Sequence, residues 1–161
     1  MSVRLGVGYD SHRFAAGRPL RLGGVTIPHT HGLVGHSDGD AVLHAITDAL
    51  LGAAALGDIG SRFPDTDPQW KGKDSATFVA GAVDALGRSG MAVHQVDVTV
   101  IAERPRLAPH VDAMRAATAT ALRVPVDRVS IKAKTNEGMG WVGRGEGIGV
   151  IAVATVRETP A

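Results

Sequence analysis

Residues 148–156, IGVIAVATV, decide the fold and lie near the end of the 161-residue chain. Small and β-branched apolar residues run through this stretch, which is typical of a β-strand. Alternate residues of a strand face opposite sides. One side here carries Ile148, Val150, Ala152 and Ala154, and the other carries Ile151 and Val153. Both faces are therefore apolar, and since one layer of helices covers only one face, we expect the second face to pack against other subunits.

In the rest of the chain, some segments have the periodicity of strands and others that of helices. Alternation predicts strands over residues 3–9, 20–27, 92–102 and 129–134, the second with a bend at Gly23-Gly24. Helical spacing of apolar residues predicts helices over 40–53, 74–88 and 109–122, while 29–39, 58–73 and the Gly-rich 138–147 are expected to be loops or turns. The expected fold class is α+β, a two-layer sandwich of a mostly antiparallel sheet with helices on one face, in a single domain over residues 1–161.

The composition argues against several classes of function. With 17 Lys and Arg against 16 Asp and Glu, the formal net charge is +1, so no single-sign field attracts nucleic acid or an anionic membrane. Three Phe, two Trp and one Tyr are few for the stacking surface of a single-strand binder. There is no cysteine, so a metal site would use nitrogen and oxygen ligands. No signal peptide or membrane span is recognisable, and we expect a cytoplasmic protein.

Asp10 and His12 are two residues apart, so on an extended segment their side chains lie on the same side. That spacing lets both bind one ion, with His44 on the following helix as a possible third ligand. Two imidazoles and one carboxylate leave Zn²⁺ a net positive charge and an open position suited to a phosphate oxygen. Asp40 and Asp48, four residues on either side of His44, are expected to fix its tautomer. The alternative is a turn-forming aspartate, a surface His12 and a structural His44.

Two further groups of polar residues have alternative interpretations. His36 and Ser37 precede a helix, whose free N–H groups can bind a phosphate, although Ser37 can equally well cap the helix. Asp58, Asp65 and Asp67 are candidates to bind a polyol or a second cation, or else are simply solvated.

The end of the strand over 129–134 is followed by more polar chemistry. Residues 132–137, KAKTNE, offer two cations, a hydroxyl and the carboxylate of Glu137, which is able to bind Mg²⁺; the alternative is an exposed charged face. Residues 140–147, GWVGRGEG, are neither a P-loop nor a dinucleotide-binding motif. Arg144 within them either binds an anion or pairs with Glu146.

Five segments together resemble the 2-C-methyl-D-erythritol 2,4-cyclodiphosphate synthase family, from about residue 4 to residue 154. They are GYDSHRF at 8–14, HSDGDAVLHAITDALLGAAALGDIG at 36–60, FPDTDP at 63–68, KAKTNEG at 132–138 and GRGEGIG at 143–149. The resemblance implies conversion of 4-diphosphocytidyl-2-C-methyl-D-erythritol 2-phosphate to the cyclic diphosphate and CMP, in the non-mevalonate isoprenoid pathway. It also implies a homotrimer with active sites between adjacent subunits.

The resemblance further implies a set of site residues. One Zn²⁺ per subunit would be held by Asp10, His12 and His44, and a Mg²⁺ or Mn²⁺ by Glu137 and the diphosphate, while His36 and Thr135 would stabilise the transition state. The implied substrate contacts are Asp10, Ser11, His12, His36, Ser37, Asp58, Ile59, Gly60, Phe63, Pro64, Asp65, Thr66, Asp67, Ala102, Glu103, Arg104, Pro105, Arg106, Leu107, Ala108, Lys134, Thr135, Asn136, Glu137, Trp141 and Arg144. The alternatives are a zinc-dependent phosphohydrolase and a trimeric cytidine-nucleotide binding module with a structural zinc.

Overall fold

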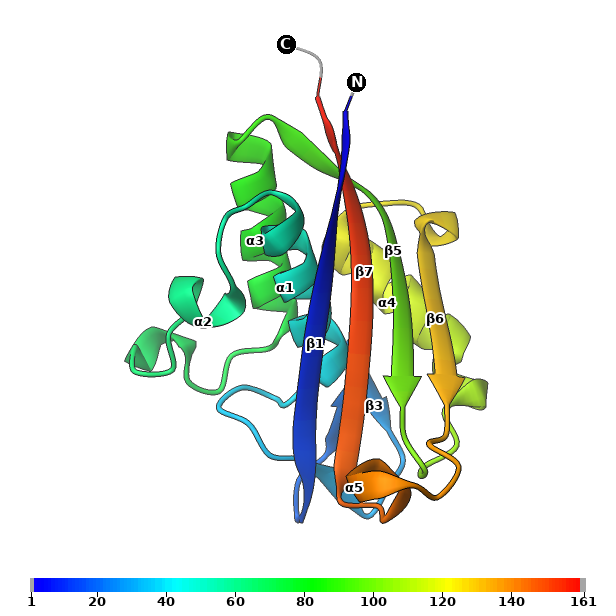
Figure 1. The fold of residues 1–161 in the computed structure, drawn as a ribbon. Helices are drawn as coiled ribbons and strands as arrows, with labels where there is room; N and C mark the ends of the chain where they lie inside the picture. The colour runs from blue at the N-terminus through cyan, green and yellow to red at the C-terminus, as the bar shows by residue number, and fades with distance from the viewer. Residues whose placement is uncertain (1, 160–161) are drawn as a thin grey trace.

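The computed structural model describes residues 2–159 and is built around a five-stranded sheet (Figure 1). In spatial order its strands are β4 (His31–Leu33), β1 (Val3–Ala16), β7 (Gly147–Glu158), β5 (Met91–Ile101) and β6 (Val129–Lys134). Every neighbouring pair is antiparallel except β5 and β6, which run parallel. The prediction of an α+β fold with a mostly antiparallel sheet is therefore confirmed.

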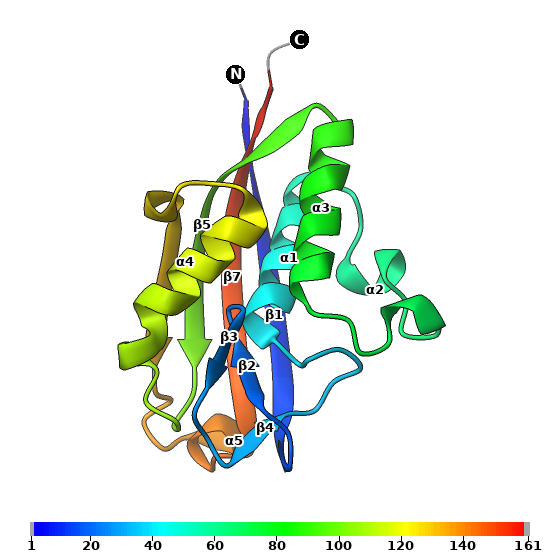
Figure 2. The same cartoon turned by 180° about the vertical axis from the view of Figure 1, so that it is seen from behind.

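Helices cover one face of this sheet (Figure 2). The long ones are α1 (Ala41–Ala53), α3 (Ala76–Arg88) and α4 (Val111–Leu122). Short helices are α2 (Ile59–Arg62), α5 (Gly140–Gly143), η1 (Pro68–Trp70), η2 (Ala108–His110) and η3 (Val126–Arg128). None of the described helices combines the length and the hydrophobicity that a membrane span requires.

The central strand β7 separates a buried face from an open one. Ile148, Val150, Ala152 and Ala154 are fully buried against the helical layer. On the other face Ile151 is 41% exposed, and its neighbours on β1 are exposed as well: Val3, Leu5, Val7 and Tyr9. The alternation predicted for residues 148–156 is thus confirmed, and in a single chain its second apolar face lies open. That this face packs against other subunits stays a prediction.

Helix α1 lies directly against β1 because two glycines face it. A Cβ atom added at Gly8 would lie 1.8 Å from the carbonyl oxygen of Ala45, and one added at Gly6 would lie 2.1 Å from that of Ala49. Only glycine fits at such a close approach. The next residues on the same side of β1, Asp10 and His12, are therefore brought next to α1.

Three local elements differ from the predictions. Residues 20–27 form a two-stranded hairpin, β2 (Leu20–Leu22) with β3 (Val25–Ile27), instead of one bent strand. Gly23 and Gly24 make its turn with φ of 58° and 77°, and the buried carboxylate of Asp40 accepts both of their N–H groups. Strand β4 lies inside the segment expected to be a loop, where it pairs with the end of β1. The 58–73 segment is also partly helical, since it contains α2 and η1.

Candidate metal centre and ligand pockets

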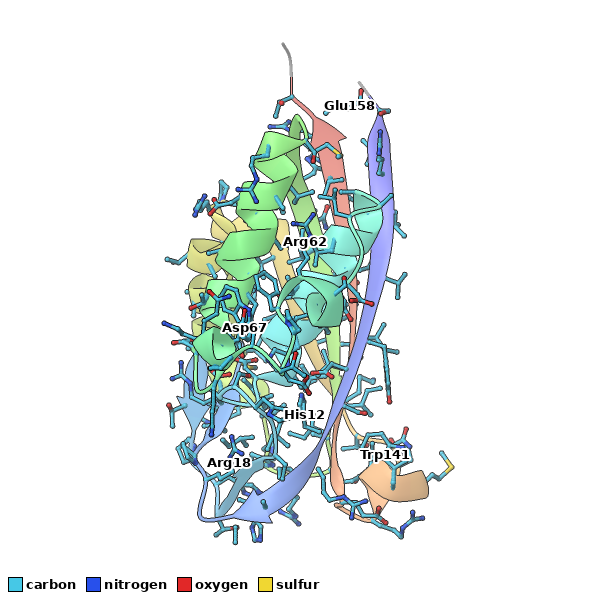
Figure 3. The ribbon with its side chains drawn as sticks, turned by 90° about the vertical axis from the view of Figure 1, so that its left-hand side faces the viewer. His12, Arg18, Arg62, Asp67, Trp141 and Glu158 are labelled. Atoms are coloured by element: carbon cyan, nitrogen blue, oxygen red, sulfur yellow. The ribbon has the colours of Figure 1, made fainter. Side chains whose placement is uncertain are left out.

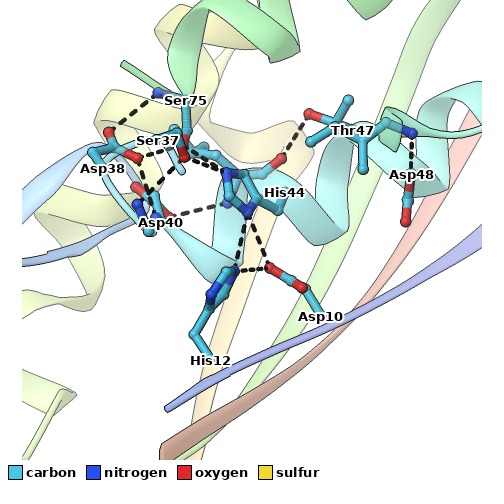
Figure 4. A network of polar contacts seen from close by, with 12 residues as sticks. Asp10, His12, Ser37, Asp38, Asp40, His44, Thr47, Asp48 and Ser75 are labelled. Carbon is cyan, nitrogen blue, oxygen red and sulfur yellow. Dashed lines mark hydrogen bonds and ion pairs between the residues drawn. The ribbon is translucent and has the colours of Figure 1, made fainter. Parts of the chain in front are cut away.

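Asp10, His12 and His44 converge in one cluster between β1 and α1 (Figure 4). Oδ2 of Asp10 lies 2.8 Å from Nε2 of His12 and 3.1 Å from Nδ1 of His44, and the two nitrogens are 3.2 Å apart. Ligands at ~2.0–2.1 Å around a tetrahedral Zn²⁺ lie about 3.3 Å from one another, so the three atoms nearly match that arrangement. Within residues 2–159 this is the one group of three or more acidic or histidine side chains that could hold a metal ion. The predicted ligand set is thus brought together.

The ring orientation of each histidine is fixed by a second hydrogen bond. Nδ1 of His12 contacts the backbone oxygen of Val34 at 2.5 Å, which leaves Nε2 facing the cluster. Nε2 of His44 lies 2.9 Å from Oγ of Ser37 and 2.9 Å from Oγ of Ser75, so its Nδ1 faces the cluster.

The prediction that Asp40 and Asp48 fix the tautomer of His44 is wrong. The carboxylate of Asp40 accepts backbone N–H groups from the Gly23-Gly24 turn and from Leu43, where it caps α1. Oδ1 of Asp48 accepts the N–H of Ile59 at 2.7 Å and holds α2 against α1. Helical spacing places both carboxylates near His44, but each carboxylate accepts hydrogen bonds from backbone N–H groups instead.

The cluster carries a persistent negative charge on Asp10. Burial raises the pKa of this carboxyl, but hydrogen bonds from His12 and His44 outweigh burial and hold its pKa below 3.8. Burial likewise lowers the pKa of His12, and its hydrogen bond to Asp10 outweighs this effect, so the pKa of the ring is raised above 6.5. Asp10 therefore draws positive charge, a proton or a metal ion, into the site.

A pocket of about 420 Å³ opens beside the cluster. Its lining residues are His12, Val34, Gly35, His36, Ser37, His44, Ile59, Gly60, Phe63, Asp65, Trp70, Lys71 and Phe78. Phe63, Trp70 and Phe78 form one wall, with ring centroids 5.1 to 6.1 Å apart. The sequence analysis missed Trp70, Lys71 and Phe78, because single aromatic and lysine residues within the 58–88 region carry no spacing signal. We call this cavity the metal-side pocket.

The acidic residues of the 58–67 segment mostly shape the loop. Asp58 caps α2 by accepting the N–H of Ser61, and Asp67 caps η1 by accepting the N–H of Gln69. Asp65 lies at the pocket, with its carboxylate 3.5 Å from Nε2 of His36. In the described part of the chain these three carboxylates do not join a group able to hold a second cation.

Most of the substrate residues predicted at 102–108 and 134–137 line a separate, smaller pocket of about 150 Å³, where the parallel strands β5 and β6 end, whereas Arg104 lies at a neighbouring pocket with Arg144. Its lining residues are Ala102, Glu103, Pro105, Arg106, Leu107, Ala108, Ala133, Lys134 and Thr135. Oε1 of Glu103 accepts the N–H groups of Asn136 and Gly138, which fixes the turn that carries Glu137. We call this cavity the strand-end pocket. It shares no residue with the metal-side pocket.

Trp141 and Arg144 line neither the metal-side pocket nor the strand-end pocket. Trp141 on α5 lines a small pocket with Ser11 and His12, and its ring packs on Gly149. In a side view, His12 and the segment with Asp67 lie on the helical side of β1, whereas Trp141 lies beyond β1 at the end of the sheet (Figure 3). Nε of Arg144 donates to Glu146 at 2.7 Å, so in the single chain this arginine forms the ion pair considered as the alternative to anion binding.

The fold and the site together define an α+β protein with a cluster of nitrogen and oxygen ligands able to hold a metal ion beside a pocket. Residues 3–157 match the YgbB family. The 2-C-methyl-D-erythritol 2,4-cyclodiphosphate synthase of Burkholderia mallei (strain SAVP1) is 57% identical over 162 residues, covering the whole of both chains. The chain therefore belongs to the YgbB family, which confirms the resemblance seen in the sequence.

Solved structures agree with this membership. A 2C-methyl-D-erythritol-2,4-cyclodiphosphate synthase in its CDP-bound form is 42% identical, with a TM-score of 0.88 over 96% of this chain and 100% of that one. The bifunctional IspDF of Campylobacter jejuni is 39% identical, with a TM-score of 0.94 over 98% of this chain. The chain spans only 42% of the length of that bifunctional protein.

Proposed function

We propose that this chain converts 4-diphosphocytidyl-2-C-methyl-D-erythritol 2-phosphate to 2-C-methyl-D-erythritol 2,4-cyclodiphosphate and CMP, as a metal-dependent phosphorus–oxygen lyase of the non-mevalonate isoprenoid pathway in the cytoplasm. Family membership and the full-length relatives named for this reaction support the proposal. The observation that carries it is the convergence of Asp10, His12 and His44 at the metal-side pocket. Such a centre beside a pocket suits a substrate rich in phosphate oxygens.

We assign Zn²⁺ to the cluster of Asp10, His12 and His44, one ion per subunit. The donor set supports zinc, since two imidazoles and one carboxylate are common zinc ligands and leave one position open. We assign Mg²⁺ or Mn²⁺ to Glu137 together with the substrate diphosphate, because carboxylate and phosphate oxygens suit these ions. Bound at these places, the ions supply positive charge to phosphate oxygens that otherwise repel one another.

The side chains of the protein then need only to position the substrate and stabilise the transition state, because the 2-phosphate of the substrate is itself the nucleophile that attacks the β-phosphorus. His36, exposed at the rim of the metal-side pocket, is placed to donate a hydrogen bond to a phosphate oxygen. Thr135 offers a hydroxyl for the same purpose from the strand-end pocket. The 58–67 segment would hold the methylerythritol part, and residues 102–108 and 134–137 the cytidine and its phosphates. No covalent intermediate with the protein is required.

We further propose that the enzyme is a homotrimer whose active sites lie between adjacent subunits. Two observations support this assembly: the substrate residues fall into two pockets that share no residue, and the sheet has an uncovered apolar face. In the assembly, the metal-side pocket of one subunit would face the strand-end pocket of its neighbour. Trp141 and Arg144 would complete the contact set.

Mixing two inactive variants tests the shared site. In His44→Ala the metal side is defective, and in Thr135→Ala the neighbouring side is defective. Randomly mixed trimers of the two should regain activity at about a quarter of their sites, because half of the subunits supply each intact side. Activity of the mixture no higher than the average of the two variants alone would contradict the shared site.

The reaction itself is tested by its products. The purified protein with the diphosphocytidyl substrate and Mg²⁺ should release CMP and the cyclic diphosphate in equal amounts. Release of inorganic phosphate would instead indicate a phosphohydrolase, and binding of cytidine nucleotides without turnover would indicate a binding module. Chromatographic separation of the products distinguishes the three.

A further inference from the structure

Ser75 is placed at a helix start where its hydroxyl does not perform the usual task. It is the N-cap residue of α3, yet its side chain makes no capping hydrogen bond. A serine at this position normally accepts a backbone N–H of the first turn. The hydroxyl of Ser75 is instead fully buried and contacts Asp38 and His44 (Figure 4).

The carboxylate of Asp38 fixes the direction of the hydrogen bonds that Ser75 donates. Oδ2 of Asp38 accepts the N–H of Ser75 at 3.1 Å, and Oδ1 contacts the Ser75 hydroxyl. An ionised carboxylate only accepts, and a serine hydroxyl has a single proton, so Ser75 donates that proton to Asp38. Oγ of Ser75 then offers only lone pairs to Nε2 of His44, which lies 2.9 Å away, so it accepts a proton that this nitrogen carries.

Ser37 fits the same directions. Its Oγ lies 3.2 Å from Oγ of Ser75 and accepts the N–H of Gly39 at 3.4 Å. Its own proton has two acceptors within reach, Oγ of Ser75 and Nε2 of His44 at 2.9 Å, and it goes to Ser75 when Nε2 carries a proton. When a metal ion occupies Nδ1 of His44, the proton of the neutral ring lies on Nε2, and Ser75 is then the group that accepts it.

We infer that Ser75 and Asp38 are positioning residues, which accept the Nε2 proton of His44 and so orient the ring with Nδ1 toward a metal ion beside Asp10 and His12. We call the hydrogen-bonded chain from Asp38 through Ser75 to His44 the relay. The inference deepens the proposed function and rests on it, since it assigns to the relay the preorganisation of the third metal ligand. Ser75 lies 31 residues beyond His44 and directly precedes α3, so the relay joins α1, α3 and the loop before α1. A carboxylate behind a metal-binding imidazole orients the ring and makes it a stronger ligand.

Zinc affinity of the full-length protein, measured by competition with a chromophoric chelator, tests the inference without an activity assay. Ser75→Ala should weaken zinc binding by roughly 10–100-fold, the range typical of residues that orient a ligand. Ser75→Thr, which keeps the hydroxyl, should retain most of the affinity. The matched control is Thr118→Val, which removes another fully buried hydroxyl on α4 and should leave the zinc affinity unchanged.

Nitrogen-15 chemical shifts of His44 give a second readout, which a purely structural role would not move. In the zinc-bound wild type the Nε2 signal should show a strongly hydrogen-bonded proton, and in Ser75→Ala the zinc-bound ring should lose that signature. If Ser75→Ala fails to fold, Asp38→Asn removes the carboxylate and should give a smaller loss of zinc affinity, of several-fold.

The outcomes separate this inference from the metal proposal on which it rests. Unchanged zinc affinity and an unchanged Nε2 signal in Ser75→Ala, with binding in the wild type that depends on His44, would overturn the relay alone. A wild-type protein whose zinc binding does not depend on His44 would overturn the metal assignment, and the relay with it.

Discussion

Nδ1 of His44 lies 3.1 Å from Oδ2 of Asp10, although 34 residues separate them in the chain. The contact is made because α1 lies directly on β1, at the place where Gly6 and Gly8 present no side chain. Backbone packing between a strand and a helix thus builds the metal centre. A ligand set assembled in this way depends on the fold as much as on its three side chains.

The first prediction concerns the ligands themselves. His44→Ala should weaken zinc binding by more than about 100-fold, beyond the effect of residues that only orient a ligand, because a donor atom is lost. His110→Ala, on a histidine outside the cluster, should leave the bound zinc content unchanged. Metal analysis after gel filtration checks both. A zinc-replete, fully active His44→Ala protein would remove the metal assignment.

The close approach of α1 to β1 gives a second prediction. Gly8→Ala should lower the free energy of unfolding by at least ~1–3 kcal/mol, since its Cβ would overlap the backbone of Ala45, and should also weaken zinc binding. Gly52→Ala is the control on the exposed side of α1, where nothing lies within 4 Å of an added Cβ. It should raise stability by about 0.5–1 kcal/mol, because alanine is the better helix former. Urea unfolding compares the two, and equal effects would contradict the packing account.

The uncovered face of the sheet predicts an assembly that one charge can break. Leu5 is 62% exposed in the single chain, and Leu5→Glu should convert trimers to monomers, because a carboxylate would be buried without a partner. Val126→Glu places the same charge on an exposed valine of η3, outside the strands of the sheet, and should leave the trimer intact. Light scattering during gel filtration measures both masses. A monomeric wild type, or a trimeric Leu5→Glu variant, would count against the assembly.

The same sheet face carries an ion pair with a defined pH dependence. Nζ of Lys132 donates to Oδ2 of Asp97 at 2.6 Å, and this hydrogen bond holds the pKa of the carboxyl below its ordinary 3.8. The stabilisation is therefore present above pH 3.8 and is lost as the pH falls through the lowered pKa of the folded state. Because both side chains are about half exposed, it amounts to less than ~1 kcal/mol.

An NMR titration of the Asp97 carboxyl measures this shift directly. The midpoint should lie below 3.8 and should rise in Lys132→Ala, while Lys73→Ala, on an exposed lysine of the loop before α3, should not move it. A midpoint that is the same in the wild type and in Lys132→Ala would show that the ion pair is not formed in solution.

The periodicity of the sequence predicted the features that depend on residues close together in the chain, namely where strands lie and which side chains share a face. The alternation of residues 148–156 located β7, and the spacing of Asp10 and His12 placed two ligands on one side of β1. His44 was considered as a third ligand because it lies on the polar side of the helix expected over 40–53. The family resemblance, which no periodicity supplies, grouped these residues with those of the strand-end pocket.

The errors about side-chain partners at the site involve groups that are distant in sequence. Asp40 and Asp48 were assigned to His44 because they are one helical turn away, whereas the structure gives them to the Gly23-Gly24 turn and to Ile59. The true partner of the ring, Ser75, resembles an ordinary helix cap in the sequence. Which backbone N–H competes for a carboxylate is decided by tertiary packing, and one sequence does not contain that information.

The central claim is that the cluster of Asp10, His12 and His44 binds the zinc that the cyclisation requires. Phosphorus-31 NMR of the purified protein with the diphosphocytidyl methylerythritol phosphate substrate and Mg²⁺, recorded before and after zinc is stripped, tests it most directly. We predict signals of the cyclic diphosphate and CMP that disappear on stripping and return when zinc is restored. Intact substrate in the zinc-loaded sample, or turnover that survives complete zinc removal, would contradict the account.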